Sequence, residues 1–446
     1  QYTDVRGDVA LDLDSLLTID VPAGTQPCDT FGVYPKLTEV QSLYAGGELA
    51  FVANIGALVE PLTKDEYNAG AKEVPPSLFA HNINQRSAQN VHAQQADAKG
   101  VLGRMADALD EDGYTTAVYS INGNAKAVEA ELIAADIIHK TRGVTLFTAQ
   151  DELGPEVSNL TRFVSESIFA ETYADKLQTT LARTVVLDAA LADVTLTESF
   201  SDDSLSAQLE QVASVVAARA ALGSPRGVFF VELIGFDTPS DMDTTLSGLL
   251  GDVNDALGSF VAEMKAQGTW GNVTIVSASD FGRTLTSNGL GTDHAWGGNH
   301  FVAGGSVKGG QVFGQYPTDL TDDGAENIGR GRLIPTLPWE AVWNAVARWF
   351  DVPDGALGSV LPNLPNFNSS YLLTADELFY WVTPQVPVSD PTPSPSVSAE
   401  PTETPVPAPS KAPTGDPAAT PAPAPQPTVF PGDSTAAPVI PPTAQP

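Results

Sequence analysis

Hydrophobic and polar positions follow two patterns along the chain, one typical of buried strands and the other of amphipathic helices. Residues 227–234 (GVFFVELI) form a near-continuous apolar run, and a β-branched run follows at 273–276. Between these runs, apolar residues recur at helical spacing from Leu246 to Met264. This order predicts a β-α-β unit, and such crossovers are almost always right-handed with parallel strands.

The same two patterns predict the other main helices and strands. Strands are expected at 49–55, 115–121 and 301–305, and helices at 36–44, 205–222 and from Pro338 onward. A further helix is expected from Gln85 to Leu109, broken around Gly100, and residues 160–196 also have a helical pattern. Alternating strands and helices predict an α/β fold, here a three-layer sandwich around a mainly parallel central sheet.

Composition divides the chain near Pro384. Twenty of the 35 prolines lie in the last 63 residues, mixed with Ser, Thr and Ala. Such a segment cannot bury a core and favours polyproline II conformations. We therefore expect residues 1–383 to form the folded domain and residues 384–446 to form a disordered, extended linker or stalk, without packed contacts to that domain.

Charge excludes several classes of partner. The formal net charge is −33, with 55 acidic against 22 basic residues, which disfavours binding to nucleic acid or to an anionic membrane. No apolar run reaches the ~18 residues that a membrane-spanning helix needs. Cys28 is the single cysteine, so an intrachain disulfide is not expected.

Other features favour a location outside the cell. The chain begins with Gln1 instead of Met, so we expect that an upstream segment has been removed. Three N-glycosylation sequons begin at Asn159, Asn272 and Asn368. We expect a secreted or cell-surface glycoprotein.

Acidic residues and histidines gather after the two strands of the β-α-β unit. Asp237 follows the first strand, Asp280 follows the second, and a Gly-rich loop then carries Asp293, His294 and His300. The carboxyl ends of parallel strands meet at one edge of a sheet, which places Asp237 and Asp280 on the same side. Carboxylates and imidazoles on glycine-rich loops are what a divalent metal needs, so these five residues are the expected ligands.

A structural interpretation of the same residues stays open. Asp237 also fits an N-cap-like turn before a helix, and the other aspartates fit turns while the histidines pack. Arg283 is the candidate catalytic residue, either as a clamp for an oxyanion or as an ion-pair partner of Asp280.

Several motifs occur in a fixed order along the chain. They are FGVYP (31–35), LFAHNxNQ (78–85), LGRMADAL (102–109), FFVELIGFDT (229–238), SDFGRT (279–284), GTDHAWGG (291–298), FVAGGxVKGGxVFGxYP (301–317) and PWEAVWNAVARWF (338–350). In these motifs the chain resembles domain-of-unknown-function family 1501, part of the alkaline-phosphatase and sulfatase-like superfamily. The resemblance covers roughly residues 1–375 and implies an alkaline-phosphatase-like fold.

The resemblance also implies roles for individual residues. Enzymes of the superfamily use a two-metal centre of Asp and His ligands, with a Ser or Thr nucleophile after the first strand. Asp280 stands where the superfamily has a metal-binding Asp, Asp237 lies in GFDT, and Asp293 with His294 matches an Asp-His pair of the family. His81 falls at a family position within LFAHNxNQ.

The chain departs from the family pattern at several places. Pro239 stands where the family has His after GFDT, and Tyr34 stands where it usually has His. Phe281 occupies a place where many active superfamily members carry a second metal-binding His or Asn, although the family itself generally has Phe. The family's first strand, with its Gly-Gly-x-Asp element and the nucleophile region, is expected before Gln1.

These matches and departures together lead to a functional hypothesis. We expect at most one divalent ion per chain and favour a non-catalytic structural or surface role, with a partly degraded metal site. The alternative is a metal-dependent hydrolase of phosphate or sulfate esters. We also expect a cleaved N-terminal piece or a segment of a neighbouring subunit to fill the place of the first strand in the sheet.

Overall fold

The structure is a computed structural model that describes residues 1–121, 123–147, 149–162 and 166–380. The chain divides into two units, residues 1–385 and 386–446. The expected stalk, residues 384–446, lies outside the described residues, so its conformation stays a prediction. All elements of the fold described here belong to the first unit.

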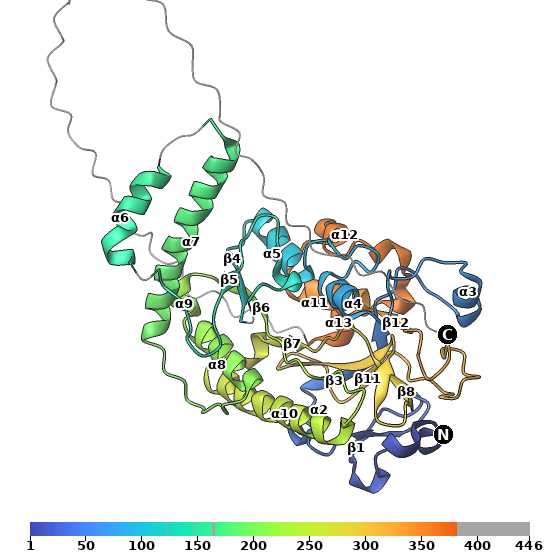
Figure 1. Ribbon diagram of the computed structural model, residues 1–446. Helices are drawn as coiled ribbons and strands as arrows, with labels where there is room; N and C mark the ends of the chain where they lie inside the picture. Colours follow the sequence, from blue (N-terminus) through green and yellow to red (C-terminus); the bar gives the residue numbers. More distant parts are fainter. Residues whose placement is uncertain (122, 148, 163–165, 381–446) are drawn as a thin grey trace, which may run out of the picture. The chain divides into compact units, whose positions relative to one another are not determined.

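The larger sheet has five strands (Figure 1). They are β3 (Leu49–Gly56), β7 (Thr274–Val276), β10 (Gly298–Gly304), β11 (Val312–Phe313) and β12 (Leu337–Pro338). β10 runs antiparallel to β3 and β7, whereas β11 and β12 pair with β3 in parallel. Successive β3 side chains alternate between two core clusters, with Ala50 and Val52 in one and Leu49 and Phe51 in the other. Both faces of this sheet are therefore covered.

A second sheet contains three parallel strands. β4 (Thr116–Ser120) lies between β5 (Asp136–Ile137) and β6 (Arg226–Phe230). Two small antiparallel pairs lie outside these sheets. They are β1 (Leu17–Asp20) with β2 (Thr30–Val33), and β8 (Arg283–Ser287) with β9 (Thr292–His294).

Helices cover both faces of the two sheets. On one face the core cluster is built from α4 (His81–Asn90), α5 (Val101–Glu111) and α11 (Trp339–Trp349). On the other face it is built from α2 (Thr38–Ala45), α8 (Ser204–Ala217) and α10 (Met242–Ala266). The second cluster takes Phe229 from the smaller sheet and Ile275 from the larger one, so one helical layer covers both. The result is a mixed α/β sandwich of three layers.

The expected mainly parallel sheet is found only in part. The smaller sheet is parallel throughout, but β10 gives the larger sheet a mixed character. The reason lies in the connection between β7 and β10, which contains the β8–β9 pair and no helix. A parallel return needs a long crossover, usually a helix, whereas a strand that returns without one pairs antiparallel.

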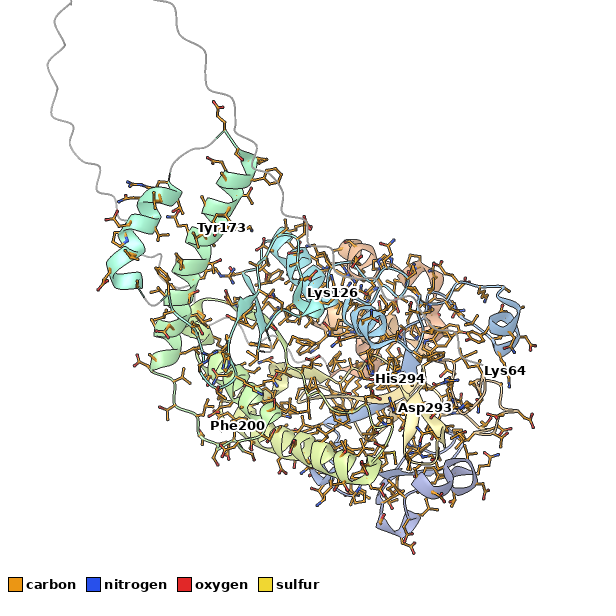
Figure 2. All side chains as sticks on the ribbon, viewed as in Figure 1. Lys64, Lys126, Tyr173, Phe200, Asp293 and His294 are labelled. Carbon is orange, nitrogen blue, oxygen red and sulfur yellow. The ribbon has the colours of Figure 1, made fainter. Side chains whose placement is uncertain are left out.

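The remaining helices are α1 (Tyr2–Arg6), α3 (Lys64–Ala69), α6 (Gln150–Thr161), α7 (Ile168–Ala192), α9 (Arg219–Leu222), α12 (Leu357–Val360) and α13 (Ala375–Leu378). α6 and α7 form a helical pair with exposed apolar side chains, among them Tyr173 (Figure 2). Among the described residues, no helix combines the length and the apolar composition that crossing a membrane requires.

Candidate metal centre

Two loops at one edge of the sheets carry the acidic residues of the site. Asp237 lies in the loop between β6 and α10, and Asp280 lies in the loop after β7. The α10 crossover joins the two strands, which belong to separate sheets. His81 contacts both carboxylates, so the two loops meet there.

His81 comes from a distant part of the chain, at the first position of α4. The turn before this helix is fixed by Asn84, whose side-chain amide donates to the carbonyl oxygens of Ser77 and Ala80. Phe79, in the same turn, has a left-handed backbone with φ of 71°. The carbonyl oxygen of Phe79 lies 2.7 Å from Nδ1 of His294, which joins the turn to the opposite side of the site.

His294 is the last residue of β9 and pairs with Arg283 at the start of β8. The backbone before β8 lies very close to the backbone after β9. A Cβ atom at Gly282 would be only 2.0 Å from the carbonyl oxygen of Gly297. Glycine is therefore required at position 282. This close approach brings Arg283 and His294 beside the two acidic loops.

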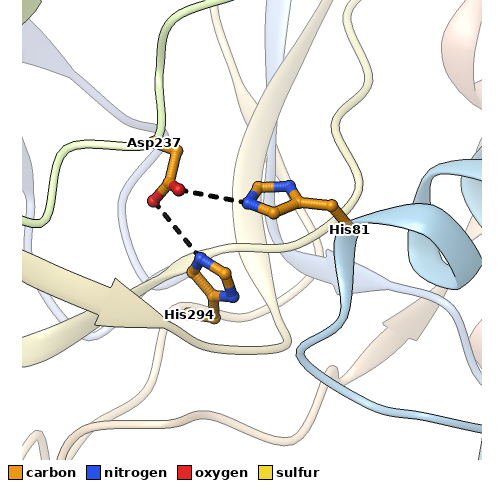
Figure 3. Close-up of side chains that lie close together, drawn as sticks. All are labelled: His81, Asp237 and His294. Atoms are coloured by element: carbon orange, nitrogen blue, oxygen red, sulfur yellow. Dashed lines mark hydrogen bonds and ion pairs between the residues drawn. The ribbon is translucent and has the colours of Figure 1, made fainter. Parts of the chain in front are cut away.

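Three side chains converge on one point (Figure 3). Nε2 of His81 lies 3.3 Å from Oδ2 of Asp237, and Nε2 of His294 lies 3.2 Å from Oδ1 of the same carboxylate. All three ligand atoms lie within 4.8 Å of one another. Two imidazole nitrogens and a carboxylate oxygen form a donor set that suits zinc and similar divalent ions.

The second nitrogen of each imidazole already has an acceptor. Nδ1 of His294 meets the Phe79 carbonyl oxygen, and Nδ1 of His81 lies 2.5 Å from Oδ2 of Asp280. If each Nδ1 carries the proton, each Nε2 has a lone pair that points at an oxygen of Asp237. Two hydrogen-bond acceptors then face each other, which is unfavourable. Protonation of the imidazoles or a bound cation removes this repulsion. Histidines that bind metals usually donate their other N–H to a carboxylate or a backbone carbonyl, as here.

Arg283 forms an ion pair with Asp237, whereas Asp280 was the partner named in one of the two interpretations of its sequence position. Its Nη1 lies 2.7 Å from Oδ1 of Asp237, and its Nε donates to Oγ1 of Thr292 at 3.2 Å. Nη2 donates to the carbonyl oxygen of Thr292. Three of the five guanidinium N–H groups are thus engaged, which holds a positive charge beside the three converging side chains.

The surroundings set the protonation of the two central groups. The pKa of Asp237 is lowered, because hydrogen bonds from Arg283 and His81 outweigh the opposing effect of desolvation. The pKa of His81 is raised, because Asp280 and Asp237 outweigh desolvation, which acts in the other direction. The side chains of His81 and Asp237 are 46% and 42% exposed, so a small ligand can reach them.

Aromatic packing fixes the orientation of both imidazoles. The buried ring of Phe281 lies with its centroid 4.7 Å from that of His81 and 4.4 Å from that of His294. The two imidazole rings are 4.5 Å apart and nearly perpendicular. Phe281 acts as an apolar support for both imidazoles.

Two of the expected ligands lie apart from this cluster. Asp293 accepts a hydrogen bond from Asn288 and forms an ion pair with Arg330, and these contacts lower its pKa despite some desolvation. Figure 2 shows Asp293 next to His294 on the same strand, where adjacent side chains point to opposite faces. Asp293 therefore contacts other groups although it neighbours a ligand in sequence.

His300 occupies a different environment on β10. Its Nε2 lies 3.4 Å from Oγ of Ser279, and its ring packs against Trp339 at a centroid distance of 5.0 Å. Desolvation lowers the pKa of His300 to about 4, so its imidazole is neutral at pH 7. Of the five expected ligands, Asp237 and His294 belong to the cluster, and Asp280 contacts it through His81.

The third member, His81, was not among the expected ligands. It lies far from the other two in sequence, and neither spacing nor periodicity connects it to them. The one signal was its position in the LFAHNxNQ motif.

Pro239, in the loop beside Asp237, is held by the β8–β9 connection, because Asn288 donates to its carbonyl oxygen at 3.2 Å.

Comparisons with known proteins place the chain in a family. It matches none of the curated proteins. Among solved structures, Ps i-CgsB in complex with k-i-k-neocarrahexaose has 13% sequence identity and a TM-score of 0.33, over 71% of this chain and 67% of that one. The PsFucS1 sulfatase from Pseudoalteromonas sp. has 12% identity and a TM-score of 0.32, over 72% of this chain and 63% of that one. Residues 18–329, more than half of the chain, match the family described as protein of unknown function (DUF1501), and the chain belongs to that family.

Proposed function

We propose that this protein binds one divalent metal ion through His81, Asp237 and His294, and that it hydrolyses an anionic ester, a phosphate or a sulfate, at this site. The observation that carries the proposal is the convergence of three ligand atoms within 4.8 Å of one another. A divalent ion in such a site polarises the ester and lowers the pKa of a bound water molecule. Three protein ligands leave coordination positions open for both.

The ligand count supports one ion and not two. Two ions would share roughly six ligands, as in the two-metal centres of related chemistry. Asp280 is engaged with His81, Asp293 with Asn288 and Arg330, and His300 lies against Ser279 and Trp339. Pro239 supplies no ligand in place of the family's His. Asp280 then acts as a positioning residue that orients His81.

Charge supports an anionic substrate. The carboxylates of Asp237 and Asp280 balance a divalent ion, and the guanidinium of Arg283 remains in excess. An anionic ester group neutralises this excess, and guanidinium groups bind such oxygens well. The overall negative charge of the chain repels anions at long range, so the attraction has to come from the ion and Arg283 at the site itself.

A second candidate is a secreted or cell-surface protein that binds metal without catalysis. One observation favours it, since Arg283 forms an ion pair with Asp237 and so offsets the charge of this carboxylate. Among the described residues, no Ser or Thr hydroxyl is hydrogen-bonded to His81, Asp237 or His294. The Pro-rich residues 384–446 fit a stalk, which suits either candidate at a cell surface.

Metal content and ester hydrolysis together test the proposal. The purified protein is analysed for bound metals, stripped with a chelator and titrated with Zn²⁺ and Mn²⁺ by calorimetry. Hydrolysis is then measured with 4-nitrophenyl phosphate and 4-nitrophenyl sulfate. We expect one ion per chain and a hydrolysis rate that depends on it. The variant His92→Gln, which changes an imidazole outside the cluster, serves as the control.

Each outcome decides between the candidates. One bound ion without hydrolysis of either ester supports the non-catalytic candidate. Two tightly bound ions would contradict the single-ion site. Failure to bind any divalent ion would remove both candidates and leave the cluster as a hydrogen-bonded structural feature.

A further inference from the structure

Exposed apolar side chains gather on the helical pair of α6 and α7. Among the described residues, six large apolar side chains are at least 71% exposed, and four of them belong to this pair. The four are Leu160 on α6 and Ile168, Phe169 and Tyr173 on α7. Apolar surface that is concentrated in one place, instead of scattered over the molecule, is typical of an interaction site.

The two helices are held to the rest of the fold at one end of α7. Leu187 is buried in the core cluster under α8 and α10, and Arg183 forms an ion pair with Asp136 of β5 at 2.6 Å. α6 packs mainly against α7, and Figure 1 shows the pair extending away from the sheets. The exposed side chains therefore belong to a part of the fold that is anchored at one end and uncovered over much of its length.

The exposed apolar residues of the two helices lie on the same side of the pair. A short connection joins α6 to α7 and the helices pack together, so they run antiparallel. On α6, Leu160 directly precedes Thr161, which is half-buried against α7. On α7, Tyr173 directly precedes the half-buried Ala174, and Phe169 lies one turn earlier. A step of one residue turns a side chain by about 100°, in opposite senses for antiparallel helices viewed along one axis, so both exposed rows face the same side.

The size of this apolar surface matches a stable interface. We call it the hairpin face, and its residues are Leu153, Leu160, Phe169 and Tyr173. These side chains are between 45% and 85% exposed and together present on the order of 500 Å² of apolar surface. A stable complex buries about 800 Å² on each partner, of which a little more than half is apolar. The hairpin face therefore supplies the apolar area that one partner needs.

Opposite charges border the hairpin face on its two helices. Glu156 on α6 follows Leu153 by three positions, and it is exposed. Lys176 on α7 follows Tyr173 by three positions, and it is also exposed. Residues three apart are neighbours on a helix surface, so each charge borders the apolar row of its own helix, on the side away from the other helix. A face with an acidic border on one helix and a basic border on the other is complementary to itself after a twofold rotation.

We propose that the hairpin face binds the hairpin face of a second copy of this chain. A twofold axis parallel to the helices places α6 of one copy against α7 of the other, so that four helices pack together. The leucine row on α6 then meets the aromatic row on α7 of the second copy. In the same arrangement, Glu156 comes beside Lys176 of the second copy.

Charge gives this dimer a characteristic dependence on salt. The net charge of −33 on each copy opposes association at long range, and it also disfavours contact with an anionic membrane. Salt screens the repulsion between the copies, whereas contact between apolar side chains does not depend on it in this way. We therefore expect the dimer to become tighter as the NaCl concentration rises from about 0.05 M to about 0.5 M.

Sedimentation velocity and light scattering of the full chain test the proposal. We expect twice the mass of one chain at high protein concentration in about 0.5 M NaCl, and partial dissociation on dilution. The mass of a single chain at all protein concentrations up to about 100 μM would overturn the proposal.

The double variant Phe169→Glu/Tyr173→Glu tests whether the hairpin face is the interface. It places two carboxylates within the apolar face, and aromatic side chains often dominate the binding energy of an interface, so we expect at least about 100-fold weaker association. Leu290→Glu is the matched control, because Leu290 is 73% exposed but lies outside the pair, and it should leave association unchanged. Circular dichroism shows that each variant is folded. Unchanged association of the folded double variant, or an equal loss in the control, would overturn the hairpin face as the interface.

Exchange of the two bordering charges tests the arrangement of α6 on α7 without any change to the apolar residues. Glu156→Lys and Lys176→Glu should each weaken association by about two- to fivefold. The variant that combines both substitutions should restore it, because the pair is reformed with its charges reversed. Failure of the combined variant to restore association would overturn this arrangement.

Flotation with phosphatidylcholine vesicles distinguishes a second copy from a lipid surface. We expect the protein to stay in the soluble fraction, because the hairpin face is covered in the dimer. Binding of single chains to the vesicles that is lost in Phe169→Glu/Tyr173→Glu would overturn the second copy as the occupant of this face.

Discussion

Glu340 and Asp237 are both carboxylates with a charged neighbour, but they lie in opposite surroundings. Glu340, on α11, is 1% exposed, and its Oε1 has no hydrogen-bond partner. Desolvation raises the pKa of Glu340 to about 8, against weaker opposing effects from hydrogen bonds and from the charge of Arg104. Asp237 is 42% exposed, contacts a guanidinium and two imidazoles, and has a lowered pKa.

The comparison shows why the core is unsuited to charge and the sheet edge is suited to it. Arg104 directs its N–H groups to the carbonyl oxygens of Asn90, Lys99 and Val360, so they do not reach Glu340. Desolvation lowers the pKa of Arg104 itself to about 10. At the edge, by contrast, open loops supply complementary groups at close distances. A cation is therefore expected at the sheet edge, where neighbouring polar groups keep the carboxylate ionised, and not in the core, where burial keeps it protonated.

Glu340→Gln should give the largest change in stability. The folded pKa of Glu340, about 8, lies above its ordinary value of 4.5, so ionisation above pH 8 opposes the folded state. The contribution of Glu340 to the free energy of unfolding is therefore lost as the pH rises from about 4.5 to about 8. We expect the variant to be more stable at pH 9 by on the order of 2–4 kcal/mol and nearly unchanged at pH 4. Urea denaturation across this pH range measures the difference.

Glu263→Gln provides the control for this prediction. Glu263 is also 1% exposed, but its carboxylate accepts hydrogen bonds from Thr197, Glu198 and Gln267. These bonds lower its pKa despite desolvation, so its contribution is present at neutral pH and lost as the pH falls. We expect this variant to lose about 1–3 kcal/mol at pH 7. Parallel pH profiles for the two variants would contradict the comparison.

His294→Ala should nearly abolish metal binding at the edge. It removes one of three ligands, and two ligands hold a divalent ion poorly. We expect the affinity for Zn²⁺ to fall by more than about 100-fold, a larger loss than the 10–100-fold typical of residues that only support a ligand. Calorimetric titration of the chelator-treated protein measures it. An unchanged affinity would place the ion elsewhere.

Much of the fold could be predicted from the sequence, because strands and helices follow local patterns. The order strand, helix, strand was predicted as it is found in β6, α10 and β7, but β6 ends at Phe230 and the two strands lie in separate sheets. The antiparallel direction of β10 was not predicted, because it depends on the β8–β9 connection and not on the pattern within β10.

The candidate site was less predictable, because it combines distant segments. Asp237 and Asp280 follow the two strands of the β-α-β unit, so topology alone placed them at one edge, and His294 lies on the segment that follows Asp280. His81 opens a helix on the other side of the sheet, and only the fold brings it there. The contact between the guanidinium of Arg283 and Asp237 also follows from no pattern along the chain. It depends on how the loop after β6 and the start of β8 lie relative to each other in the fold.

Asp280→Asn should have an intermediate effect at the metal centre. The amide oxygen can still accept the N–H of His81, but without the negative charge that makes the imidazole a stronger ligand. We expect about a tenfold weaker affinity for Zn²⁺. Asp293→Asn is the matched control and should leave the affinity unchanged, because Asp293 is engaged with Asn288 and Arg330. Equal losses in both variants would point to a general effect of charge.

Arg283→Gln should give the smallest change, with opposite signs for two ligands. Arg283 and a metal ion compete for the carboxylate of Asp237. Because the ion pair is partly exposed, it contributes about 0.2–1 kcal/mol, and its loss should tighten Zn²⁺ binding by about two- to fivefold. Inorganic phosphate and sulfate should bind more weakly, since the excess positive charge is gone. Calorimetry with each ligand measures both signs, and weaker binding of both would mean that Arg283 only supports the local fold.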